Sequence, residues 1–312
     1  WKNSKIIPIF KKGDPTKLSN YRPVSCLPAA SKVLEAIVLA QITEYFEANN
    51  LLPQQQHGFR VGRSTTSAVA SLVAEWSKAY EAGQSTGVLL WDLSSAFDTI
   101  DVEILCRKLR LYGVADRTVG WFRSFLVDRR QQVQVGNGLS QPETTSIGCP
   151  QGSLLSPIMF LIYVADMELW VDEASVSGYA DDTATYVSDE DEDVVVSKLE
   201  KEAKRVLAFM ASNFLLANAK KTGFLLIRKN RSTATREVTV GHERIPEQAN
   251  HRILGLTVTN TLAWKDHVTH LLNSLHQRIG ALRRISHHVA PNYLPTIASA
   301  IITSKVRFGI AV

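Results

Sequence analysis

The chain has 312 residues, 45% of them hydrophobic and 21% charged, which is typical of a globular protein with a buried core. No internal repeat or low-complexity block is present, and the longest apolar run, Ile158 to Val164, is far too short to cross a bilayer. The three cysteines form no Cys-x-x-Cys pair, and the eight histidines have no zinc spacing. We therefore expect two or three packed subdomains, reduced thiols, an intracellular location and, where a metal is bound, oxygen ligands.

The formal net charge of +5 is unevenly distributed along the chain. Residues 1–23 and residues 261–312 each carry six Lys or Arg and one Asp, so the stretch between them sums to −5. Basic ends could contact the flanks of a polyanion while the acidic centre gathers cations. The alternative is that the charges are distributed along the chain by chance. Because the chain begins at Trp1 and stops at Val312 without a polar tail, we expect a fragment of a larger protein.

The first third of the chain mixes extended segments with helices. Residues 1–23 are extended, with turn signals at Gly13-Asp14-Pro15 and Asn20. Apolar residues at helical spacing predict helices over 28–48 and 65–82, the second capped by Ser64 or Thr65. "GVLLWDLSS", Gly87 to Ser95, begins as a nearly continuous apolar run and predicts a buried strand.

The remaining elements complete an α+β pattern, in which helices and antiparallel hairpins surround a short sheet. The acidic run Asp189 to Asp193 suits the N-terminus of a helix better than a metal site. In chain order the sequence predicts helices over 101–112, ended by Gly113, and 116–128; a hairpin turning at Gly136-Asn137-Gly138; a buried helix over Pro157–Trp170; a hairpin over Ser177–Val187; a helix ending near 212; strands over 222–228 and 251–259 with a hairpin between them; and a basic helix over 264–289.

Three aspartates occupy positions where an ionised carboxylate is energetically unfavourable. Asp92 ends an apolar strand run, and a carboxylate there must be paired, hydrogen-bonded or bound to a cation, although a helix N-cap would explain one such residue. About ninety residues later, Asp181 and Asp182 stand side by side in "SGYADDTATYV", where they repel each other. Carboxylates from different elements are what two-metal phosphoryl transfer requires, and the metal charge would offset this repulsion.

Several motifs, in order, resemble those of reverse transcriptases, most closely the enzymes of non-LTR (LINE-type, jockey-like) retrotransposons. The three core motifs of the polymerase palm are matched by "WDLSSAFDTID", "GCPQGSLLSPIMFLIYV" and "GYADD". The flanking matches are "IIPIFKKGD…NYRPVSCLPAASKVLE", "QHGFRVGRST", "NAKKT" and "RILGLTVTNTLAWKDHV", so the resemblance covers nearly the whole chain.

The resemblance implies a right-hand polymerase fold of the α+β class. Its regions would be fingers with part of the palm over 1–83, palm over 84–260 and a partial thumb over 261–312. The implied activity is RNA-directed, primer-dependent DNA synthesis with two Mg²⁺ ions, or Mn²⁺ in their place. The implied partners are an RNA template, a DNA primer and dNTPs, with no membrane, and an endonuclease domain upstream in the full-length protein. The implied location is a cytoplasmic ribonucleoprotein and the nucleus.

The resemblance also implies roles for individual residues. Asp92, Asp181 and Asp182 would bind the metals, with Asp92 and Asp181 the principal ligands. Lys221 would stand near the leaving pyrophosphate as a proton donor, unless it is a simple surface lysine. The expected dNTP contacts are Lys11, or equally Lys12, Arg22, Leu93, Phe97, Gln151 and Gly152. The expected nucleic-acid contacts are Arg60, Tyr179, Arg278, Arg283 and Arg284.

Among the dNTP contacts, Phe97 would be the steric gate that excludes a ribose 2′-hydroxyl, with an ordinary core position as the alternative. Gly152 would allow a close backbone approach, Gln151 would offer amide hydrogen bonds and Arg22 would hold the triphosphate. Asp98 would be structural, as an N-cap for the following helix, and the hairpin over Val238–Ile245 would occupy the primer-grip position.

Some positions depart from the family pattern without touching the three aspartates. Gly223 stands where an acid is usual, Asn260 where an Asp is common, and Val102 where a histidine is frequent. Two other functions stay open from the sequence. One is a decayed remnant that binds nucleic acid without catalysis, and the other is an intron-maturase-like reverse transcriptase with a further RNA-binding domain after Val312.

Overall fold

The structure is a computed structural model that describes residues 2–94, 96–219, 221–228, 235–310 and 312. The chain forms two compact units, each built from three separate segments. Unit 1 comprises Trp1–Phe59, Asp92–Asp172 and Arg205–Asn218, and unit 2 comprises Arg60–Trp91, Glu173–Lys204 and Ala219–Val312. Ser95, the predicted end of a strand, and Lys220 of "NAKKT" lie outside the described residues. The division into fingers, palm and thumb stays a prediction.

Unit 1 combines a mixed sheet with helices. Its strands are β1 (Asn3–Phe10), β2 (Tyr21–Cys26), β4 (Leu93–Ser94), β5 (Arg129–Val135), β6 (Gly138–Leu139), β7 (Glu143–Thr145) and β10 (Leu216–Ala217). Its helices are η1 (Leu18–Asn20), α1 (Ala29–Ala48), α3 (Val102–Leu111), α4 (Asp116–Leu126), α5 (Ser156–Val164) and η2 (Ala165–Trp170). The main sheet has the order β2-β1-β5-β6, with β7 also paired to β5, and β10 pairs with β4.

Unit 2 is built on an antiparallel sheet of order β11-β3-β9-β8. Its strands are β3 (Ser85–Trp91), β8 (Ser175–Tyr179), β9 (Asp182–Asp189), β11 (Gly223–Ile227), β12 (Glu237–Val240), β13 (Glu243–Pro246), β14 (Asn250–Ile253) and β15 (Leu256–Thr259). Its helices are α2 (Thr65–Glu81), α7 (Lys265–Ile285), η3 (Ser286–His288), η4 (Pro291–Tyr293), α8 (Leu294–Ala298), a π-helical turn η5 (Ser299–Thr303) and α9 (Ser304–Arg307). Helix α6 (Glu192–Ser212) begins in unit 2 and ends in unit 1.

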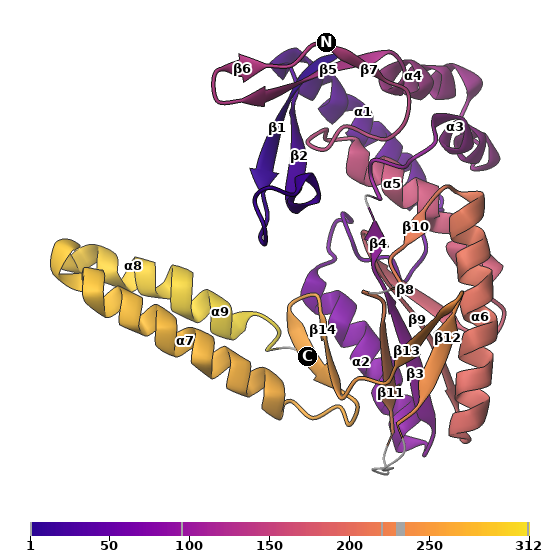
Figure 1. Ribbon diagram of the computed structural model, residues 1–312, viewed down its shortest axis with the longest axis vertical. Coiled ribbons are helices and arrows are strands. Elements are labelled where there is room, and N and C mark those ends of the chain that lie inside the picture. The colour runs from indigo at the N-terminus through magenta and orange to yellow at the C-terminus, as the bar shows by residue number, and fades with distance from the viewer. Residues whose placement is uncertain (1, 95, 220, 229–234, 311) are drawn as a thin grey trace. The chain divides into compact units, whose positions relative to one another are not determined.

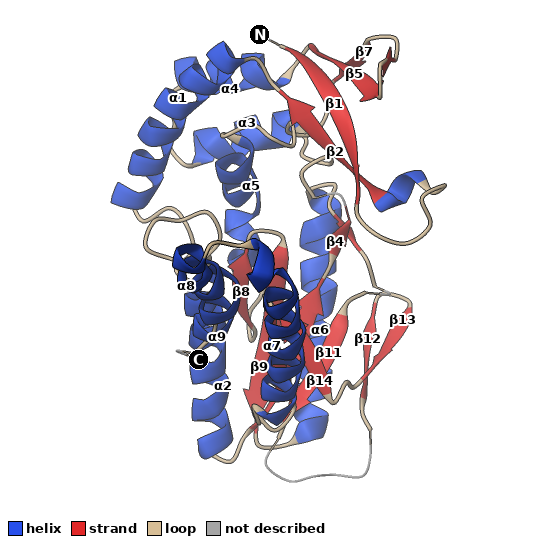
Figure 2. Ribbon diagram, turned by 90° about the vertical axis from the view of Figure 1, so that its left-hand side faces the viewer, coloured by secondary structure: helices blue, strands red, loops and turns tan. Residues whose placement is uncertain are grey.

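The sheet of unit 2 is covered by α2 on one face and by the first half of α6 on the other (Figures 1 and 2). Trp76 of α2 packs in one cluster with Val88 of β3, Tyr186 of β9 and Leu225 of β11. On the opposite face a Cβ at Gly87 would lie 2.6 Å from Val195 of α6, so glycine permits this close packing. Because β3 is central and buried on both faces, its sequence from Gly87 to Trp91 is continuously apolar rather than alternating.

Most predicted elements are confirmed, including the helices near 28–48, 65–82, 101–112 and 116–128 and the hairpins at 177–187 and 238–245. Ser64 is the N-cap of α2 and forms a reciprocal capping box with Ser67. No helix within the described residues combines the length and apolar character needed to cross a membrane.

Three predictions need correction. The single strand over 251–259 is wrong, because the chain turns at Leu254-Gly255 and forms the β14–β15 hairpin. The helix over Pro157–Trp170 is α-helical only to Val164 and continues as the 3-10 helix η2. Asp98 is not an N-cap; Asp101 caps α3, with its carboxylate accepting a 2.8 Å hydrogen bond from the Ile104 amide.

Candidate functional site

The acidic pair lies at the tip of the β8–β9 hairpin in unit 2. Tyr179 pairs with Asp182, so Ala180 and Asp181 form a two-residue loop. Ala180 has a φ of 59°, in the left-handed region where a residue with a Cβ is strained by about 1–2 kcal/mol. Asp181 and Asp182 are exposed, whereas Thr183, the next residue of β9, is buried. The tight, strained tip therefore presents both carboxylates to solvent.

The residues next to Asp92 and Asp182 in the chain form the last pair of the β3–β9 ladder. Trp91, the last residue of β3, pairs with Thr183, and its Nε1 donates to Thr185 Oγ1 at 2.8 Å. Asp92 directly follows Trp91 in the chain, and Asp182 directly precedes Thr183. At this end the β3–β9 pairing stops at Trp91 and Thr183, both in unit 2.

In unit 1, the Asp92 carbonyl accepts a 2.8 Å hydrogen bond from the Asn218 amide, and the buried Leu93 pairs with Ala217. These contacts fix the backbone on the C-terminal side of Asp92. Leu93 itself is 8% exposed, so its side chain belongs to the packed interior rather than to an open surface.

The chemistry of these side chains fits a hard divalent cation, since carboxylate oxygens are the ligands that such ions prefer. Within the described residues, however, no group of three or more His, Cys, Asp or Glu side chains is arranged to hold a metal ion. Asp92 belongs to unit 1, and Asp181 and Asp182 belong to unit 2. The metal-binding triad therefore stays a prediction.

Gln151 and Asp98 are joined in unit 1. The Gln151 side-chain amide donates to both carboxylate oxygens of Asp98, at 2.9 and 3.0 Å. The backbone of the same two segments is also bonded, because the Cys149 amide donates to the Phe97 carbonyl at 2.8 Å. Asp98 is therefore structural, as expected, but its role is to orient Gln151 rather than to cap a helix.

Gly152 lies against β2 more closely than any residue with a side chain could. Its φ is +120°, and a Cβ would lie 2.6 Å from the Ser25 carbonyl oxygen. The Ser25 amide donates to the Gln151 carbonyl at 2.6 Å, and Lys32 Nζ contacts the Gly152 carbonyl. The loop that carries Gln151 and Gly152 is thus held to β2 and to the first turn of α1.

Phe97 is half-buried, and its ring packs against Phe160 of α5 with the ring centroids 4.9 Å apart. Because Phe160 is fully buried, it gives the Phe97 ring a rigid support. One face of Phe97 is therefore packed while part of the ring stays accessible. This arrangement fits a gate as well as a core position.

The sequence motifs did not single out Glu35, which is fully buried on α1. Its carboxylate accepts hydrogen bonds from Ser31 Oγ at 2.7 Å, from Ser153 Oγ at 2.6 Å and from the Leu154 amide at 2.6 Å. Glu35 therefore fixes the residues that follow Gly152. A signal was present, since Glu35 shares the buried helical face of Ile42 and Phe46, where a carboxylate needs partners.

The predicted phosphate contacts of unit 1 lie on or beside the β1–β2 hairpin. Arg22 is exposed on β2, opposite Ile9 on β1. Lys11 is also exposed, directly after β1, and its backbone amide donates to the Asn20 carbonyl at 2.8 Å. Both side chains are accessible to a ligand.

The predicted contacts of unit 2 differ in their surroundings. Lys221, Arg283 and Arg284 are exposed, Tyr179 is half-buried, and Arg60 is only 8% exposed. Arg278 of α7 donates from Nη1 to the Ile301 carbonyl of η5 at 2.8 Å, so this guanidinium also supports the helical packing. Arg60 is the least accessible of these candidate contacts.

Comparison with known proteins gives consistent similarities. Residues 9–258 match the family model of the reverse transcriptase (RNA-dependent DNA polymerase). The chain is 27% identical over 292 residues to the probable RNA-directed DNA polymerase from transposon BS of Drosophila melanogaster, covering 91% of this chain and 32% of that protein. It is 26% identical over 300 residues to the RNA-directed DNA polymerase from mobile element jockey of the same fly, covering 93% of this chain and 32% of that protein.

The chain thus spans about a third of the length of these curated relatives. Among solved structures, telomerase from Candida tropicalis in complex with a fragment of telomeric RNA is similar, with a TM-score of 0.59 and 14% identity. That match covers 97% of this chain and 53% of the telomerase chain. It supports the fold alone, and it agrees with the predicted α+β, right-hand polymerase fold.

Proposed function

Because the chain belongs to the reverse transcriptase (RNA-dependent DNA polymerase) family, we propose that it catalyses RNA-templated, primer-dependent DNA synthesis. The observation that most strongly supports this proposal is the family match over residues 9–258, which includes all three aspartates. The curated relatives are RNA-directed DNA polymerases of fly mobile elements, which favours a non-LTR retrotransposon as the source of the activity. The proposed substrates are dNTPs, an RNA template and a DNA primer.

The proposed metal ions are two Mg²⁺ ions. Their proposed ligands are Asp92, Asp181 and Asp182. When bound, such ions lower the pKa of the attacking primer hydroxyl and stabilise the charge of the leaving pyrophosphate. The exposed hairpin tip supports this assignment, because its two carboxylates are accessible and are oxygen donors.

The remaining roles concern the incoming nucleotide. Gln151, oriented by Asp98, and Gly152, held against Ser25, form the proposed rigid edge beside the base and sugar. Phe97, supported by Phe160, is the proposed gate that leaves no room for a 2′-hydroxyl.

Charged side chains complete the proposal for the triphosphate. The exposed guanidinium of Arg22 suits bidentate contact with phosphate oxygens, and Lys11 adds a second positive charge. Lys221 is the proposed proton donor to pyrophosphate, and its exposure leaves the ammonium group accessible. The nucleic-acid contacts are assigned to Arg60, Tyr179, Arg278, Arg283 and Arg284.

Primer extension on an RNA template tests the proposal. The protein is incubated with a primed RNA, dNTPs and Mg²⁺, alongside Asp181→Ala and the matched control Asp116→Ala. Asp116 is an exposed helix residue that forms an ion pair with the exposed Arg110, so its loss changes little. We expect extension by the wild type and the control and none by Asp181→Ala. A folded wild type that incorporates no more dNTP than Asp181→Ala would refute catalysis and favour a non-catalytic remnant.

A further inference from the structure

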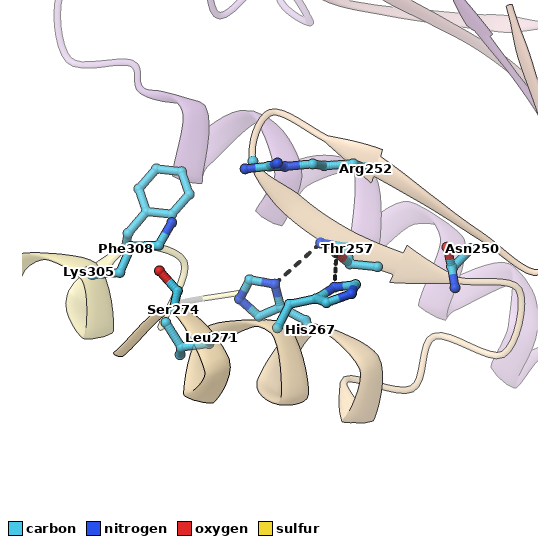
Figure 3. Close-up of a pocket in the computed structure, with 10 residues that line it drawn as sticks. Asn250, Arg252, Thr257, His267, Leu271, Ser274, Lys305 and Phe308 are labelled. Atoms are coloured by element: carbon cyan, nitrogen blue, oxygen red, sulfur yellow. Dashed lines mark hydrogen bonds between the residues drawn. The ribbon is translucent and has the colours of Figure 1, made fainter. Parts of the chain in front are cut away.

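A cavity of about 410 Å³ lies among the β14–β15 hairpin, α7 and α9 of unit 2 (Figure 3). Its ionisable lining comes from separate elements: Arg252 from β14, His267 and His270 from α7, and Lys305 from α9. In the part of the chain that the structure describes, no Asp or Glu lines this cavity. The cavity therefore gathers basic side chains from elements that are distant in sequence.

A second cavity of about 380 Å³ shares Arg252, Lys305 and Phe308 with the first and adds Arg278. Lys305 Nζ lies 5.6 Å from the centroid of the Phe308 ring, a cation–π arrangement that holds the ammonium group beside both cavities. Like charges gathered in a partly enclosed space repel one another, and a bound anion would relieve this repulsion.

A hydrogen bond to His267 leaves one nitrogen of its ring able to donate to an anion in the cavity. The Thr257 amide donates to His267 Nδ1 at 3.3 Å, which leaves Nε2 of the neutral ring as a donor (Figure 3). Burial, and then the charges of Lys305, His270 and Arg252, lower the pKa of His267, so this ring stays neutral near pH 7. Within the described residues, neither Arg252 nor Lys305 forms an ion pair with a carboxylate.

We propose that this cavity binds a phosphate group, through the Arg252 guanidinium, the Lys305 ammonium and the Nε2–H of His267. A guanidinium gives phosphate a bidentate contact, and an ammonium adds a point charge. The phosphate comes either from the backbone of a nucleic-acid strand or from a free polyphosphate, since both present the same oxygens. This inference adds a defined pocket to the exposed arginines at the end of α7, and it does not require polymerase activity.

Direct binding measurements test the proposal without metal ions or dNTPs, so that the result is independent of catalysis. The probes are inorganic pyrophosphate, followed by calorimetry, and a labelled 12-nucleotide single-stranded DNA without terminal phosphates, followed by anisotropy at several salt concentrations. The test variant combines Arg252→Gln with Lys305→Gln. The matched control is Arg307→Gln, an exposed residue of α9 that does not line either cavity.

We expect the double variant to weaken binding of one probe about tenfold, because charge-assisted hydrogen bonds are lost. Weaker pyrophosphate binding assigns the pocket to free polyphosphate. Weaker DNA binding assigns the pocket to a nucleic-acid strand. In that case the slope of log K against log salt concentration should be smaller in magnitude by about 1.4, for two lost phosphate contacts. His267→Phe keeps the ring without the donor and should give a partial loss on the same probe. Equal affinities of wild type, double variant and control for both probes, with unchanged circular dichroism, would overturn the proposal.

Discussion

Single residues set the backbone shape around the candidate site residues of each unit. Gly152 is held where a Cβ would meet the Ser25 carbonyl, and Ala180 accepts a left-handed conformation at the tip that carries Asp181. Gly223, a departure from the family pattern, has a similar cause. A Cβ there would lie 2.6 Å from the His251 ring, so the space that an acid would need is already filled. The departure is thus accommodated within unit 2 and leaves the aspartates unchanged.

Replacing Gly152 by Ala should destabilise the protein by about 1–3 kcal/mol, since the backbone is strained and the Cβ meets backbone rather than a flexible side chain. It should also raise the KM for dNTP, because Gln151 is displaced with the loop. Gly136→Ala is the matched control, as Gly136 also has a positive φ but nothing within 4 Å of its Cβ. Thermal unfolding and steady-state kinetics measure both effects. Equal losses in the two variants would contradict the close-approach account.

Replacing Phe97 by Ala should weaken exclusion of ribonucleotides by roughly tenfold or more, because the packed ring no longer fills the space expected for a 2′-hydroxyl. The measurement is the ratio of kcat/KM for a dNTP to that for the matching ribonucleotide. Phe214→Ala serves as control, because Phe214 is 62% exposed in the same unit. If Phe97→Ala discriminates between the two sugars as the wild type does, Phe97 is a core residue and not a steric gate.

At the scale of elements, regular periodicity was predictable and long-range contacts were not. The apolar run of β3 and the helical spacing of α2 and α7 are local signals, and the elements form where they predict. The β14–β15 hairpin was missed because "RILGLTV" is apolar on both sides of its turn. The residue before Gly255 is Leu254, which adopts a φ of 47°, whereas turns usually place a polar residue there.

The network around Glu35 was missed for a different reason. Its carboxylate bonds to Ser153 and Leu154, more than one hundred positions away, so no local pattern contains the partnership. The same holds for Asp98. It was predicted to be a helix N-cap, but in the structure its carboxylate accepts hydrogen bonds from Gln151. The motif residues themselves were predictable; which of them touch was not.

Replacing Glu35 by Gln should cost about 2 kcal/mol of stability, because an amide cannot accept all the hydrogen bonds that now end on two carboxylate oxygens. The loop that follows Gly152 should loosen, so the KM for dNTP should rise more than kcat falls. Glu44→Gln, on the exposed side of the same helix, should change neither. A variant that loses stability while its KM stays at the wild-type value would show that Glu35 is structural only.

For the whole molecule, stability should depend on pH through half-buried histidines. Burial holds the pKa of His251 below its ordinary value, and His267 is shifted in the same direction. As pH falls through about 6.5, the unfolded chain gains protons that the folded chain does not, so stability should decrease. Urea midpoints at pH 7.5 and 5.5 measure this loss. His251→Gln should reduce the difference, and His276→Gln, on the exposed side of α7, should not.

The measurement that tests the central claim most directly is incorporation of a single dNTP opposite a defined RNA base. With Mg²⁺ present, the wild type should add the complementary nucleotide and reject the other three. Asp181→Asn should lower the rate at least about a thousandfold, and Asp116→Asn should leave it unchanged. Incorporation that ignores the template base, or that survives in folded Asp181→Asn at the wild-type rate, would contradict RNA-templated synthesis by these carboxylates.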